Sequence, residues 1–125
     1  MSVLDEIKGR LELGKSRYGH GVRVNMDTTT WGTSKNSWME MAREEFLDAL
    51  VYVTADYIMA GRNSKTTSMS DMEALYLHEK TNTDDEINCE DDNELIMYII
   101  NNKQQMEVCS YKTLLFNLVN ILDAY

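Results

Sequence analysis

The stretch Ser37–Gly61, SWMEMAREEFLDALVYVTADYIMAG, decides the fold of this chain of 125 residues. Its opening Ser-Trp-Met-Glu fits a capping box, in which the serine caps a backbone N–H and the glutamate bonds back to the serine backbone. The helical pattern then runs without a break from Trp38 to the closing glycine, which supplies a stop. Because residues 49–53 are apolar nearly all round, we expect this helix at the centre of a bundle or at an oligomer interface, with Tyr52 and Tyr57 in the core.

The rest of the chain is helical by the same criteria. Apolar periodicity and capping patterns predict further helices over about residues 3–17, 70–78, 93–105 and 110–124. The first ends where two glycines permit a turn, and residues 22–36, which follow, show no helical period. A loop of this length is often functional or carries a short hairpin. The predicted fold is all-α, a helical bundle of four to five helices in a single domain over residues 1–125, completed by oligomerisation.

Composition excludes several classes of function. The net charge of −9 makes attraction to a phosphate backbone unfavourable, so general nucleic-acid binding is not expected. No segment reaches the roughly 18 uncharged apolar residues of a membrane span, and no secretory signal opens the sequence, so we expect a cytoplasmic protein. Cys89 and Cys109 form no Cys-x-x-Cys pair, which favours idle or buried thiols over a zinc or redox site.

Three carboxylates stand close together on the predicted central helix. Glu44 and Asp48 are four residues apart and Glu45 and Asp48 three, so all three can point toward one external point. Like charges at this spacing repel unless a positive charge offsets them, and Mg²⁺ with oxygen ligands is one such charge. The alternative is a solvated acidic face near a helix start, in which Arg43 pairs with a neighbouring carboxylate.

A basic segment precedes this helix. KSRYGHGVR, residues 15–23, holds the three cations Lys15, Arg17 and Arg23 in an otherwise acidic chain. Glycines let backbone N–H groups approach phosphate oxygens, and Lys and Arg neutralise them, so the segment is a candidate phosphate site. The alternative is a plain helix end, where basic residues suit the dipole and a glycine stops the helix. Tyr18 and Trp31 are the candidate contacts to a nucleobase.

Three pieces of sequence together resemble a known family. LELGKSRYG (residues 11–19), Trp38 and EEFLDALVY (residues 44–52) look like the short MazG-like nucleotide pyrophosphohydrolases, including members carried by bacteriophages. The resemblance covers about residues 1–61. It implies an all-α homodimer or homotetramer that hydrolyses (deoxy)nucleoside triphosphates, or a related nucleotide, to monophosphate and pyrophosphate. It also implies that Glu44, Glu45 and Asp48 hold catalytic Mg²⁺, in the host cytoplasm if the chain is phage-encoded.

The sequence departs from the family at one point. The family carries E-E-x-x-E on one helix and E-x-x-D on the next, whereas here the residues from Glu44 to Asp48 stand for one motif and no later helix offers the second. Glu12, on the first predicted helix, is the nearest candidate for a further metal ligand, within one chain or across a dimer. The alternative function is therefore a non-catalytic helical module on the same scaffold, which binds a nucleotide or a host protein.

Overall fold

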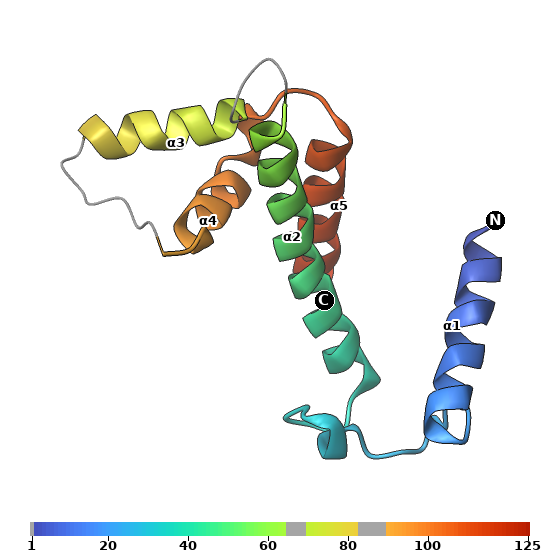
Figure 1. Ribbon diagram of the computed structural model, residues 1–125. Coiled ribbons are helices and arrows are strands. Elements are labelled where there is room, and N and C mark those ends of the chain that lie inside the picture. Colours follow the sequence, from blue (N-terminus) through green and yellow to red (C-terminus); the bar gives the residue numbers. More distant parts are fainter. Residues whose placement is uncertain (1, 65–69, 83–89) are drawn as a thin grey trace. The chain divides into compact units, whose positions relative to one another are not determined.

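The protein is all-α in the part that its computed structural model describes, residues 2–64, 70–82 and 90–125 (Figure 1). These residues contain no strand, as predicted from the sequence. The chain divides into two compact units, Met1–Trp38 and Met39–Tyr125. The elements in chain order are α1 (Val3–Tyr18), the 3-10 turn η1 (Thr28–Trp31), α2 (Trp38–Arg62), α3 (Asp71–Asn82), α4 (Asn93–Asn101), the 3-10 turn η2 (Lys103–Gln105) and α5 (Ser110–Ala124).

In the first unit, α1 is fixed at both ends by local hydrogen bonds. The Ser2 hydroxyl accepts from the backbone N–H of Asp5 at 3.2 Å, and the Asp5 carboxylate accepts from the Ser2 N–H at 3.3 Å, which completes a capping box. At the other end Gly19 adopts a left-handed conformation with φ of 79° and donates to the Lys15 carbonyl. No residue of α1 is buried, so these caps rather than a core define the helix.

The loop after α1 is organised by hydroxyl groups around a buried threonine. The Thr28 hydroxyl accepts from the backbone N–H of Ser37 at 2.8 Å and lies 2.8 Å from the Thr33 hydroxyl, which itself donates to the Lys35 carbonyl. The Thr28 N–H donates to the Asn36 side chain. The loop carries the 3-10 turn η1 instead of the short hairpin that was one expectation. The Asp27 carboxylate caps this turn by accepting from the Thr29 N–H.

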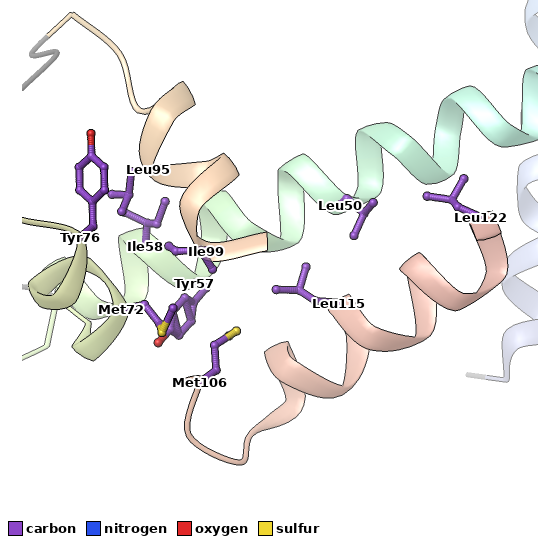
Figure 2. Packing of buried hydrophobic residues seen from close by; sticks show 10 residues of the cluster. All are labelled: Leu50, Tyr57, Ile58, Met72, Tyr76, Leu95, Ile99, Met106, Leu115 and Leu122. Atoms are coloured by element: carbon purple, nitrogen blue, oxygen red, sulfur yellow. The ribbon is translucent and has the colours of Figure 1, made fainter. Parts of the chain in front are cut away.

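In the second unit, α2 and α5 pack antiparallel (Figure 1). The start of α2 meets the end of α5 where Arg43 donates to the Leu122 carbonyl, and the end of α2 meets the start of α5 where Tyr57 and Tyr111 stack edge to face. Leu50 projects from α2 toward Leu115 on α5, as Figure 2 shows. The buried Thr54 donates its hydroxyl proton to the Leu50 carbonyl, so no polar group is lost inside this seam.

The larger part of the core lies at the C-terminal end of α2, where α3 and α4 join it (Figure 2). Met72 and Ile99 are fully buried there. Each large buried apolar side chain of this kind contributes on the order of 1.5–3 kcal/mol. The complete buried apolar cluster is Leu50, Tyr57, Ile58, Met72, Tyr76, Leu95, Ile99, Met106, Leu115 and Leu122.

An ion-pair network joins the end of α2 to α3 and α4. The Arg62 guanidinium donates to the carboxylates of Glu73, which is buried, and of Asp92. Ser70 caps α3 by accepting from the Glu73 N–H at 3.2 Å. Burying the Glu73 carboxylate is tolerated because the planar guanidinium satisfies it.

The helix boundaries differ from the sequence prediction at three places. The helix α2 continues through Gly61 to Arg62, so this glycine does not supply the predicted stop. The third helix continues to Asn82 rather than stopping near residue 78. The fourth was expected to reach residue 105 but ends at Asn101, because the Asn102 side chain donates to the Tyr98 carbonyl and the chain tightens into η2. Cys109 is a free, partly buried thiol, while Cys89 lies outside the described residues. Among the helices described, none combines the length and the apolarity that a membrane crossing requires.

Gly61 allows the close approach of α2 to the start of α3, and this generates a prediction. A Cβ at Gly61 would lie 2.5 Å from the Ser70 backbone nitrogen. Gly61→Ala should therefore lower the free energy of unfolding by about 1–2 kcal/mol in urea titrations, even after the roughly 1 kcal/mol gained in helix propensity. Gly14→Ala is the matched control, because a Cβ at Gly14 meets nothing within 4 Å. Equal stability of the two variants would contradict this packing.

Candidate functional site

The three predicted carboxylates lie on the N-terminal half of α2 and face solvent. Glu44, Glu45 and Asp48 are all exposed. Within the described residues, none of the three carboxylate side chains makes a hydrogen bond or an ion pair. Like charges three and four residues apart destabilise a helix by a few tenths of a kcal/mol per pair, so this arrangement is not a stabilising one.

The nearest cation on the same helix is occupied elsewhere. Arg43 donates through Nη1 to the carbonyl oxygens of Leu122 at 2.8 Å and Tyr125 at 3.2 Å. Both oxygens lie at the C-terminal end of α5, where the helix dipole is negative and favours a cation, and the Leu122 carbonyl also accepts from the Tyr125 N–H. In the described part of the chain, Arg43 forms no ion pair with the neighbouring carboxylates. The pairing of Arg43 with a neighbouring carboxylate, one part of the alternative interpretation, is therefore not seen among the described residues, whereas the exposure of the three carboxylates is also what a solvated acidic face would show.

The donor chemistry of these carboxylates fits a hard cation, but their number and arrangement in one chain do not complete a site. Across residues 2–64, 70–82 and 90–125, no three His, Cys, Asp or Glu side chains are arranged to hold a metal ion. Successive helix positions are rotated by about 100°, so Glu44 and Glu45 diverge. Glu12 lies on α1, in the other unit. Metal binding by Glu44, Glu45, Asp48 and Glu12 stays a prediction, and further ligands have to come from substrate or from a second copy.

The predicted phosphate-binding segment covers the last turn of α1 and the loop after it. Lys15, Arg17, Tyr18 and Arg23 are all exposed, and the described residues include no ion-pair partner for these three cations. His20 turns back on its own loop, where Nδ1 lies 2.7 Å from the Gly21 carbonyl oxygen. Because a carbonyl can only accept, Nδ1 carries the proton, and Nε2 is the nitrogen left for a ligand.

Trp31 is the aromatic residue best placed to meet a ligand. It closes η1 and is 51% exposed, whereas Trp38 is half-buried. The two rings meet edge to face with centroids 5.5 Å apart, and the Trp38 indole N–H donates to the Val24 carbonyl at 2.9 Å. Trp38 therefore holds the inner edge of Trp31 and leaves its outer surface open to solvent.

Two features near the site differ from what the sequence predicts: the exposure of Tyr52 and the capping of α5 by Arg43. Tyr52 was expected in the core but is 67% exposed, because α2 buries only the side that faces α5, α3 and α4. Tyr57 is buried as expected, and burial raises its pKa to about 12 while its hydroxyl bonds to Glu107. The capping role of Arg43 has no local signal, because its acceptors lie about 80 residues away in the sequence.

The commitment of Arg43 to α5 generates a second prediction. Arg43→Met should lower the free energy of unfolding by roughly 1–2 kcal/mol, because two carbonyls at a negative helix end lose a charged donor. Combined with Glu45→Gln, the effects should add to within about 0.5 kcal/mol in a double-mutant cycle measured by urea unfolding. A larger coupling would mean that Arg43 pairs with the acidic face after all.

Comparison with known protein families, curated proteins and solved structures finds no match to this chain. The MazG-like resemblance therefore rests only on the sequence that carries it, residues 11–19, Trp38 and residues 44–52. Function has to be argued from the geometry of the basic segment 15–23 and the carboxylates of α2.

Proposed function

We propose that this protein is a Mg²⁺-dependent nucleotide pyrophosphohydrolase, a short MazG-like protein that acts as a homodimer or homotetramer in the cytoplasm. Its reaction would convert a (deoxy)nucleoside triphosphate or a related nucleotide to monophosphate and pyrophosphate. One observation carries the proposal. The side chains of Glu44, Glu45 and Asp48 are exposed on a helix that packs against α5, and the neighbouring cation, Arg43, donates to the C-terminal end of α5 rather than to these carboxylates. The three carboxylates repel one another, and a bound divalent cation would offset this repulsion. The cluster is therefore suited to binding a ligand rather than to stabilising the fold.

The fit to Mg²⁺ is partial, and the proposal accounts for what is missing. Carboxylates, waters and substrate phosphates are the ordinary ligands of this ion, so one chain need supply only some of them. When bound, Mg²⁺ would neutralise phosphate charge and activate a water molecule. The protein's own cations, Lys15, Arg17 and Arg23, would neutralise the remaining phosphate charge. Trp31 and Tyr18 would contact the base.

A second candidate function is a non-catalytic module that binds a nucleotide or a host protein. Two observations favour it: the described residues contain no three-ligand metal group, and the sequence lacks the second acidic motif of the family. A binding module would keep the exposed cations and Trp31 but release no pyrophosphate. The two candidates therefore differ in turnover and agree in nucleotide affinity.

The decisive experiment is a pyrophosphate-release screen over (d)NTPs and nucleotide signals with and without Mg²⁺. We expect Mg²⁺-dependent release by the parent chain and none by Glu45→Gln or Asp48→Asn, because the substitutions keep shape and remove charge. The same variants should lose the thermal stabilisation by Mg²⁺, which is about 2.7 kcal/mol for any ligand at a hundred times its Kd. Glu6→Gln, an exposed acid outside the cluster, is the control. Stabilisation by nucleotide without any turnover would favour the binding module.

The basic segment generates a separate prediction. Arg17→Ala and Arg23→Ala should each weaken nucleotide binding, measured by isothermal titration calorimetry, by amounts that shrink at high salt because exposed charges are screened. The melting temperature of Arg23→Ala without ligand should hardly change, since the Arg23 side chain has no partner among the described residues. Unchanged nucleotide affinity in both variants would reduce this segment to a helix stop. Loss of folding would mean that these cations pair structurally.

A further inference from the structure

The helix α1 carries an apolar seam that its own unit leaves open. Leu4, Ile7, Leu11, Gly14 and Tyr18 follow one another at alternating spacings of three and four residues, which is the repeat of a helix that packs on another helix. Leu4 is 77% exposed, Ile7 50% and Leu11 54%. Three large apolar side chains in a row on a capped helix mark a contact surface.

The charges that border this seam decide what kind of helix it can meet. In the same repeat, Lys8 and Lys15 lie along one border and Arg10 and Arg17 along the other. Two copies of α1 packed together would bring these cations against one another in either direction, and like charges in such border positions select against pairing. The partner of α1 is therefore not another α1 but a helical surface with apolar residues and acids.

The second unit has that chemistry. Residues 1–38 hold six Lys and Arg against four Asp and Glu, a net charge of +2, whereas residues 39–125 hold six against 17, a net charge of −11. On α2, Glu44, Asp48, Tyr52 and Met59 follow one another at helical spacing on the side turned away from the core, and all four are exposed. This surface, which we call the outer face of α2, carries two acids at its N-terminal end followed by two large apolar side chains, so it offers both partners that the α1 seam and its cationic borders require.

We propose that α1 of one copy docks on the outer face of α2 of a second copy, and that the reciprocal contact closes a two-fold dimer. Seam leucines would cover Tyr52 and Met59, while the bordering cations would offset the charges of Glu44, Glu45 and Asp48. Each copy would give its α1 to the other and receive the other's α1 on its own α2, so the same contact would occur twice, as an isologous dimer requires. Its consequence for catalysis rests on the proposed function: the second copy would bring Glu12 and the basic segment to the α2 carboxylates.

A charge-exchange experiment tests the docking without relying on catalysis. Variant one is Lys15→Glu with Arg17→Glu, and variant two is Glu44→Lys with Asp48→Lys. Masses are measured by light scattering at micromolar concentration in EDTA and low salt, so that neither metal nor nucleotide contributes. Ser16→Glu, which adds an acid to α1 away from the seam, is the matched control, and far-UV circular dichroism verifies that every variant keeps its helices.

We expect the parent and the Ser16→Glu control to show about twice the 14.5 kDa mass of one chain. Each variant alone should be a monomer, because acid then meets acid or base meets base. Mixed one to one, the variants should regain the doubled mass, since both exchanged contacts are again complementary. Leu11→Asp should also be a monomer and should not be rescued by mixing.

Three results would overturn the proposal. The first is a monomeric parent. The second is a dimer that both variants keep when measured alone. The third is a mixture that stays monomeric, which would show that the occupant of the seam is not α2. If the parent is monomeric and cosediments with vesicles of phosphatidylserine, α1 with its apolar seam and cationic borders binds a lipid surface instead.

Discussion

The antiparallel contact of α2 with α5 is the interaction on which the second unit depends. Leu50, Leu115 and Leu122 are buried in this contact. At one end Arg43 donates to the last carbonyls of α5, and at the other Tyr57 packs on Tyr111 and bonds to Glu107. Because α3 and α4 add their core residues only at the C-terminal end of α2, its N-terminal half is supported on one side and open on the other. The carboxylates stand on that open side.

The distribution of charge gives this arrangement its chemical character. Cations gather in the first unit, around the end of α1, and acids dominate the second. An acidic surface repels phosphate unless a metal ion or cationic groups stand between them. The nucleotide hydrolysis and the docking of two copies that we propose both draw on this asymmetry. In each proposal the acidic face of α2 receives positive charge from outside its own unit, from Mg²⁺ or from the border of α1.

The loop of the first unit, residues 22–36, shows how a segment with few apolar residues acquires one conformation. Thr28 and Thr33 are buried, and their hydroxyls bond each other, the Lys35 carbonyl and the Ser37 N–H. Hydrogen bonds of this kind stabilise by only about 1 kcal/mol each, but an unpaired partner would cost more, so the network specifies one conformation. That conformation holds Trp31 half-exposed against Trp38.

Local patterns in the sequence were sufficient for the all-α class, the capping of α1 and α3, and the limits of α5, because periodicity, caps and stops act within a few residues. They were sufficient as well to select Glu44, Glu45 and Asp48 as neighbours on one helix. Only the tertiary structure decided that Arg43 belongs to α5 and that Tyr52 faces solvent. Both depend on which side of α2 is covered by segments about 50 to 80 residues away in the sequence, and such distant partners leave no trace in local spacing. The end of the fourth helix is different, because Asn102 bonds to the Tyr98 carbonyl only four residues away. Dependence on distant partners also limits the predicted metal site: spacing places carboxylates on one helix, but a complete set of ligands would depend on what approaches that helix from outside.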